Sequence, residues 1–74
     1  MNDEQPQNIE LSERENEVLR ELSLGKSNKQ IAVALEISRK TVEEHLTSIY
    51  SKLNVRSRSE AILWGIERAR DFPH

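Results

Sequence analysis

Apolar residues recur along the chain at the spacing of α-helices, and the pattern is clearest between residues 39 and 53. Four of them share one face of a helix: Val42, Leu46, Ile49 and Leu53. The opposite face is polar throughout and collects Lys40, Glu44, Thr47 and Ser51, with Glu43 beside them. Ser38 stands before this stretch, where its hydroxyl can cap the first turn.

Helix start and stop signals divide the rest of the chain. A serine stands three residues before a glutamate or glutamine at three places, which is the spacing of a capping box: Ser12–Glu15, Ser27–Gln30 and Ser57–Glu60. Gly25 and Asn54 can adopt the left-handed conformation that often ends a helix. The sequence therefore predicts an all-α fold with four helices, at about 13–24, 28–35, 39–53 and 58–70.

Residues 36–38 leave room only for a tight turn between the second and third helices. Two helices joined by so short a turn, the second amphipathic and capped, have the outline of a helix-turn-helix. The glycine expected in this turn is absent, and Glu36 stands in its region.

The last predicted helix carries apolar residues on two faces. Ala61, Ile62, Gly65, Ile66 and Ala69 suit packing on the core, whereas Leu63 and Trp64 point elsewhere and suggest a partner surface. The alternative that Trp64 only covers the edge of the core stays open. A glycine in mid-helix is unfavourable, so Gly65 indicates a close backbone approach at this position.

Charge is distributed unevenly along the 74 residues, although the net charge is only −2. Residues 25–58 contain seven basic side chains against three acidic ones, and both flanks are acidic. A local basic patch is what an anionic partner experiences. The chain has no cysteine and two histidines, so we expect no disulfide, no metal site, no cofactor and no enzymatic activity.

The domain organisation follows from the same patterns. Residues 1–10 lack periodicity and read as a disordered lead-in or a linker, residues 11–70 form the domain, and residues 71–74 are a tail. The polar first residues do not resemble a signal peptide, and no apolar run approaches the ~18 residues of a membrane span. We therefore expect a cytoplasmic location without membrane contact.

A long series of residues, in this order and spacing, resembles the LuxR/GerE-type (NarL/FixJ-like) DNA-binding domain. The series is Leu11-Ser-Glu-Arg-Glu15, Glu17-Val-Leu19, Gly25-Lys-Ser-Asn-Lys-Gln-Ile-Ala32, Leu35-Glu-Ile-Ser38, Thr41-Val42, His45, Ile49, Lys52-Leu53, Val55, Arg58 and Ala61. The resemblance implies a four-helix fold whose second helix positions the third in the major groove of double-stranded DNA. It also implies dimerisation through the last helix, where Leu63, Trp64 and Glu67 are the candidates.

The resemblance assigns roles to residues of the middle segment. Glu43, Glu44 and Thr47 match the positions that read base edges, although several relatives carry basic or aliphatic residues in place of the glutamates. A carboxylate can accept from a cytosine amino group, and threonine suits a thymine methyl group or a base acceptor. One of the two glutamates is expected to point away from the bases, toward Lys40. The candidates for phosphate contacts are Ser27, Asn28, Lys29, Lys40, Thr41, His45 and Lys52.

Two alternatives from other classes remain. A protein-interaction module could bind a partner helix through Trp64, and a sigma-factor-like module could contact both promoter DNA and RNA polymerase. The concentration of basic residues in 25–58 and the spacing of the last helix favour a bacterial transcriptional regulator, or the C-terminal output domain of a response regulator or quorum sensor. RNA polymerase is a further candidate partner, and no small-molecule ligand is expected in this domain. The sequence leaves open whether the chain is a complete small regulator.

Overall fold

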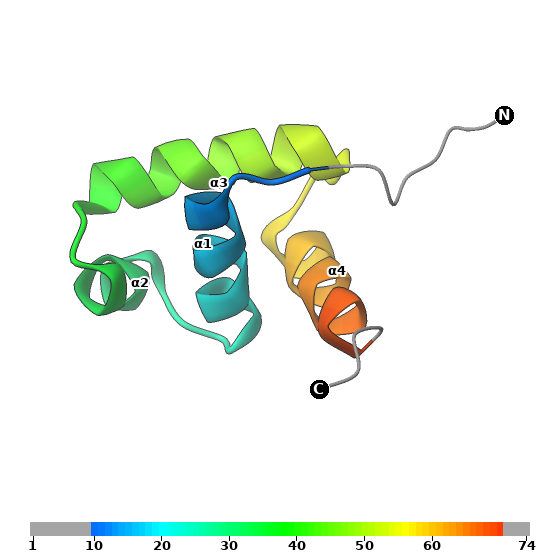
Figure 1. Ribbon diagram of the computed structural model, residues 1–74, viewed down its shortest axis with the longest axis horizontal. Helices are drawn as coiled ribbons and strands as arrows, with labels where there is room; N and C mark the ends of the chain where they lie inside the picture. Colours follow the sequence, from blue (N-terminus) through cyan, green and yellow to red (C-terminus); the bar gives the residue numbers. More distant parts are fainter. Residues whose placement is uncertain (1–9, 71–74) are drawn as a thin grey trace, which may run out of the picture.

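The computed structural model describes residues 10–70, apart from the side chain of Arg70 (Figure 1). This part of the chain forms four α-helices: α1 (Glu13–Ser23), α2 (Asn28–Leu35), α3 (Arg39–Leu53) and α4 (Arg58–Arg70). The predicted helices are confirmed, except that the first ends one residue early, with Leu24 as its C-cap. The predicted lead-in, apart from its last residue, and the predicted tail lie outside the described residues.

Local side-chain caps start the first two helices as predicted. The Ser12 hydroxyl accepts from the Glu15 amide at 3.1 Å, and the Glu15 carboxylate accepts from the Ser12 amide at 2.9 Å. Ser27 and Gln30 form the same reciprocal pair at the start of α2. The third predicted box is only half right, because Glu60 accepts from the amide of Arg56 at 2.7 Å instead of from that of Ser57.

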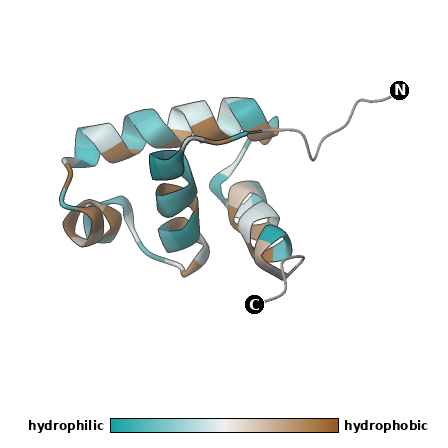
Figure 2. Ribbon diagram, in the orientation of Figure 1, coloured by the Kyte–Doolittle hydropathy of each residue, from teal (hydrophilic) through white to brown (hydrophobic). Residues whose placement is uncertain are grey.

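The first helix is the centre of the packing. α3 lies across one side of the domain, with α1 and α2 against its inner face, and α4 packs on α1 (Figure 1). Colouring by hydropathy shows the apolar side of α3 turned toward the other helices (Figure 2). The largest fully buried side chains come from three helices: Val18, Leu22, Ile31, Val42 and Ile49. The core therefore ties α1, α2 and α3 together, and it leaves the outer face of α3 uncovered by the described residues.

The turn between α2 and α3 is made without a glycine. Glu36 adopts the left-handed conformation, with φ 59° and ψ 45°, and the amide of Ile37 donates to the Ala32 carbonyl at 3.0 Å. Asn54 takes nearly the same conformation at the end of α3, as predicted. A glutamate in this region is unusual because its Cβ crowds the backbone. The short turn thus imposes the conformation on whichever residue stands there.

The prediction for the faces of α4 is partly wrong. Ala61 and Gly65 are buried, but Ile66 is 41 % exposed and Ala69 is exposed, whereas Trp64 is half-buried against the core. Ile62 packs against the core as predicted, and the inward side also includes Trp64 and Arg68, with the Arg68 guanidinium 5.5 Å from the centre of the Trp64 ring. An arginine on the inward side hides it from a search for apolar periodicity.

The close approach predicted from Gly65 is present, and it brings the α4 backbone against side chains of α1. A Cβ at this position would lie 2.1 Å from Ser23 Oγ and 3.3 Å from Leu19 Cδ1, both on α1. The Ser23 hydroxyl is itself held by a hydrogen bond to the Leu19 carbonyl at 2.8 Å. Glycine thus allows α4 to lie directly against α1.

We expect Gly65→Ala to lower the free energy of unfolding by about 1–2 kcal/mol, because the clash outweighs the better helix propensity of alanine. Urea denaturation measures the change. Gly65→Ala should cost less stability in a Ser23→Ala protein than in the wild type, because the nearest clashing atom, Ser23 Oγ, is gone. A Gly65→Ala protein as stable as the wild type would contradict the close contact.

Candidate nucleic-acid interface

The outer face of α3 presents the three residues predicted to read bases. Glu43, Glu44 and Thr47 are all exposed, while the inner stripe of the same helix is buried. Lys40, in the first turn, is also exposed, and no ion pair within residues 10–70 joins it to Glu44. The structure therefore brings two carboxylates and a hydroxyl together on one uncovered surface.

The hydroxyl group of Thr47 already has a local partner. Its Oγ1 donates to the Glu43 carbonyl, one turn back along α3, at 3.0 Å. Because that bond uses the only hydroxyl proton, Thr47 can offer an incoming group its oxygen lone pairs and its methyl group.

Five of the seven predicted phosphate contacts lie at the starts of two helices that pack on each other, whereas His45 lies in the middle of α3 and Lys52 in its last turn. Ser27 and Lys29, at the start of α2, are exposed, and Asn28 between them is half-buried. At the start of α3, Lys40 is exposed and Thr41 is half-exposed. Helix starts present unpaired amides and a positive dipole end, which suits an anion. His45 is half-exposed on α3.

The predicted basic patch is only partly available to a partner. Three ion pairs join described residues: Arg14–Glu17, Lys26–Glu21 and Lys52–Glu15. Lys26 and Lys52 are thus compensated by acidic residues of α1. Within the described part of the chain no ion pair involves the other basic residues of this segment, so its uncompensated charge lies at the starts of α2, α3 and α4 and in the turn after α3: Lys29, Arg39, Lys40, Arg56 and Arg58.

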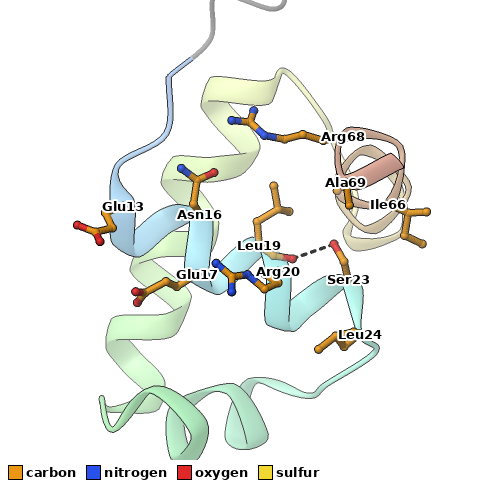
Figure 3. A pocket seen from close by; sticks show the side chains of 11 residues that line it. Glu13, Asn16, Glu17, Leu19, Arg20, Ser23, Leu24, Ile66, Arg68 and Ala69 are labelled. Atoms are coloured by element: carbon orange, nitrogen blue, oxygen red, sulfur yellow. Dashed lines mark hydrogen bonds between the residues drawn. The ribbon is translucent and has the colours of Figure 1, made fainter. Parts of the chain in front are cut away.

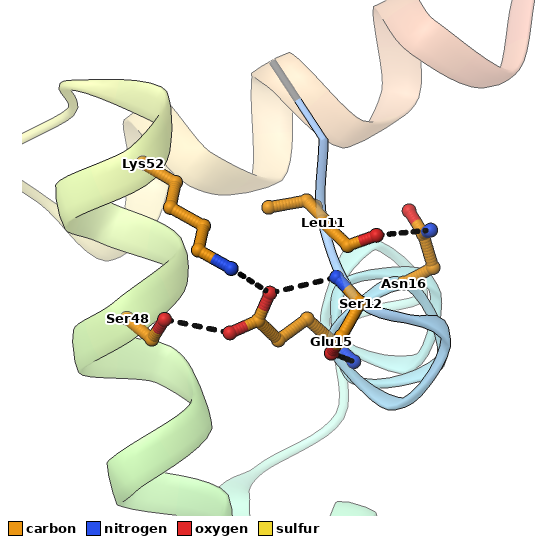
Figure 4. A network of polar contacts seen from close by, with 6 residues as sticks. All are labelled: Leu11, Ser12, Glu15, Asn16, Ser48 and Lys52. Atoms are coloured by element: carbon orange, nitrogen blue, oxygen red, sulfur yellow. Dashed lines mark hydrogen bonds and ion pairs between the residues drawn. The ribbon is translucent and has the colours of Figure 1, made fainter.

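Glu15 is the buried polar residue that connects α1 to α3 (Figure 4). Its carboxylate accepts from Ser48 Oγ at 2.6 Å and from Lys52 Nζ at 2.8 Å, in addition to its cap contact with the Ser12 amide. Ser48 and Lys52 are one turn apart on α3, so one carboxylate fixes two points of that helix. The sequence identified Glu15 only as a capping residue, because its α3 partners are more than thirty positions away.

Burial and hydrogen bonding act in opposite directions on this carboxyl group. Burial raises the pKa of Glu15, but hydrogen bonds from Lys52, Ser48 and the Ser12 amide, together with the charge of Lys52, lower it from 4.5 to about 2. The group is therefore ionised in the folded protein at all ordinary pH values.

The outer side of α4 carries the predicted dimer residues. Leu63 is 57 % exposed and Glu67 is exposed, whereas Trp64 is half-buried, as the open alternative allowed. A groove between α1 and α4 is lined by other residues of α4, among them Gly65 and Ile66, so it lies on a different side of this helix, with Leu24 of α1's C-cap also lining it (Figure 3). Among residues 10–70 no helix is long and apolar enough to cross a membrane. The same residues contain no group of three or more histidine, aspartate or glutamate side chains that could hold a metal ion.

Comparison with known proteins identifies the family. The sequence model of "Bacterial regulatory proteins, luxR family" matches residues 10–64. The chain belongs to the LuxR family. It is thus the DNA-binding domain of a transcriptional regulator and not an enzyme.

Relatives from two bacteria agree with this assignment. The chain is 55 % identical over 53 residues to the nitrate/nitrite response regulator protein NarP of Escherichia coli, covering 72 % of this chain and 25 % of NarP. It is 49 % identical over 53 residues to the transcriptional regulatory protein ComA of Bacillus subtilis, with the same coverage of both chains. The chain thus spans about a quarter of the length of these relatives.

A solved structure agrees with the fold. The crystal structure of the anti-activator RapF complexed with the response regulator ComA DNA-binding domain contains a chain that matches with a TM-score of 0.72 and 46 % identity. The match covers 76 % of this chain and 97 % of the solved one, so the four-helix arrangement is that of a LuxR-family DNA-binding domain.

The depressed pKa of Glu15 makes the free energy of unfolding depend on pH at low pH. Because the folded-state value lies below the ordinary one, the stabilisation is fully present above pH 4.5 and is lost as the pH falls toward 2. We expect Glu15→Gln to lower the free energy of unfolding by about 2–3 kcal/mol near pH 7, and the difference from the wild type to shrink between pH 5 and 2.

Urea denaturation at a series of pH values measures this difference. Glu17→Gln is the matched control, since Glu17 pairs with Arg14 at the surface and its removal should change stability by less than about 1 kcal/mol. A Glu15→Gln deficit that stays constant between pH 5 and 2 would contradict the role of the buried charge.

Proposed function

We propose that the chain binds double-stranded DNA sequence-specifically as a dimer, in the bacterial cytoplasm, with α3 in the major groove. The observation that supports this most is the division of α3 into two faces. Val42, Leu46 and Ile49 are buried, and the polar residues opposite them are exposed and uncovered within the described residues. A major groove admits one α-helix, which reads base edges through its outward side chains.

Base readout is assigned to Glu43, Glu44 and Thr47. Carboxylates accept hydrogen bonds and cannot pair with the acceptors of guanine, so the glutamates favour the amino groups of cytosine or adenine. The hydroxyl proton of Thr47 is committed to the Glu43 carbonyl, which favours a contact between its methyl group and a thymine methyl.

Affinity and register are assigned to phosphate contacts from the starts of α2 and α3. Lys29 and Lys40 are exposed basic residues there without an ion-pair partner among the described residues. Ser27, Asn28, Thr41 and His45 are further candidates on the same two helices or their caps. Lys52 is expected to contribute less, because the buried Glu15 already compensates its charge.

Dimerisation is assigned to the outer face of α4. Leu63 and Glu67 are one turn apart and both exposed, so they present an apolar side chain with a charged neighbour. Trp64, which is half-buried against the core, is a further candidate for this surface. A two-fold dimer would place two copies of α3 for successive half-sites of one operator.

The Thr47 assignment is tested by a pair of substitutions of similar size. Thr47→Val keeps the γ-methyl group and replaces the hydroxyl group with a second methyl group, whereas Thr47→Ser keeps the hydroxyl group and loses the methyl group. We expect Thr47→Val to retain the preferred base at its position and Thr47→Ser to lose about 1–3 kcal/mol of discrimination there. Fluorescence anisotropy with duplexes that differ at single base pairs measures the preference.

Lys40→Ala is the control for that experiment, since loss of a phosphate contact should weaken binding to every duplex by a similar factor. If Thr47→Ser weakens all duplexes equally, as Lys40→Ala does, the assignment of base readout to Thr47 is wrong.

The dimer interface is tested by Leu63→Glu. Leu63 is largely exposed, so a glutamate there should leave the domain folded while it places a charge in the interface. We expect sedimentation of the complex on a two-half-site duplex to show one protein copy in place of two. Leu24→Glu, at an apolar residue 67 % exposed in the turn after α1, should leave two copies bound. Two bound copies of Leu63→Glu would rule out this interface.

A further inference from the structure

The side chain of Arg58 links the first turn of α4 to the start of α2. Its Nη1 donates to Asn28 Oδ1 at 2.9 Å, and its Nη2 donates to the Lys26 carbonyl at 2.8 Å. Two contacts on one planar guanidinium fix its orientation, which a single bond would not do. Within residues 10–70 no other hydrogen bond joins α4 to α2.

These bonds decide which way the Asn28 amide faces. A side-chain amide has an acceptor oxygen on one side and a donor nitrogen on the other, and arginine offers donors only. The oxygen must therefore face Arg58, and the Nδ2 donors face the opposite way. No acceptor among the described residues takes them. Asn28 is the first residue of α2, so these donors lie beside backbone amides that have no partner within the helix.

We propose that Arg58 is a positioning residue for DNA binding: it holds the Asn28 amide with its nitrogen directed at a DNA phosphate, without contacting DNA itself. This inference rests on the proposed phosphate contact at the start of α2. Without Arg58 the amide can rotate, and half of its orientations would present an oxygen to the phosphate. Lysine keeps the positive charge but lacks the fork that reaches both acceptors, so it should not replace Arg58.

A double-mutant cycle distinguishes this role from general support of the fold. The cycle compares the wild type, Arg58→Met, Asn28→Ala and the double variant by anisotropy on one duplex. Each single substitution should weaken binding by about tenfold, and the double variant should bind no more weakly than Asn28→Ala alone, because Arg58 acts through Asn28. Arg58→Met should leave the dependence of affinity on salt unchanged, since its charge reaches no phosphate.

Two matched variants complete the design. Arg56→Met removes a neighbouring exposed charge that has no ion-pair partner among the described residues, and any effect it has should add to that of Asn28→Ala. Arg58→Lys should weaken binding as much as Arg58→Met does. Thermal unfolding is followed for each protein, and Arg58→Lys takes the place of Arg58→Met in the cycle if the latter does not fold.

The binding measurements distinguish failure of this inference from failure of the proposed function. The inference is wrong if the effects of Arg58→Met and Asn28→Ala on binding add in full. It is also wrong if Arg58→Met reduces the salt dependence by about the release of one counterion, because Arg58 would then contact DNA directly. Asn28→Ala with wild-type affinity would overturn both the inference and the phosphate contact at Asn28. Failure of the wild type to bind any duplex at low salt would instead overturn the proposed function.

Discussion

The buried carboxylate of Glu15 is the interaction on which the placement of α3 depends. It belongs to the cap that starts α1, and it also binds Ser48 and Lys52 on α3. Removing a partner from a buried charge is strongly destabilising, because the remaining charge is left uncompensated. The same residue therefore starts the central helix and fixes α3, the helix proposed to enter the major groove.

Glu15 also shapes the charge that DNA would meet. The first helix is rich in glutamate, and two of these residues bind lysines of the basic middle segment, Lys26 and Lys52. The basic side chains of this segment that have no ion-pair partner among residues 10–70 then lie at the starts of α2, α3 and α4 and in the turn after α3. An acidic protein can thus present a local positive surface, which explains why its net charge of −2 does not conflict with membership in a DNA-binding family.

Local signals predicted most of the fold, because caps and stops act within four residues. Ser12, Ser27 and Asn54 were placed correctly for this reason. The inward face of α4 was predicted less well, since its stripe includes Arg68, and whether Trp64 packs inward depends on the neighbouring helix. The candidate base-reading residues followed from a family resemblance, and the structure adds that all are exposed. Long-range partners such as those of Glu15 leave no periodic signal in a single sequence.

In the proposed dimer, two copies of α3 read a symmetric DNA site. Sequencing the duplexes that the protein binds from a randomised pool, at salt concentrations from low to physiological, tests it most directly. We expect enrichment of one site with two inverted halves, and a logarithm of affinity that falls linearly with the logarithm of salt concentration. Salt-dependent binding without an enriched sequence, or enrichment of a single unsymmetric site, would contradict it.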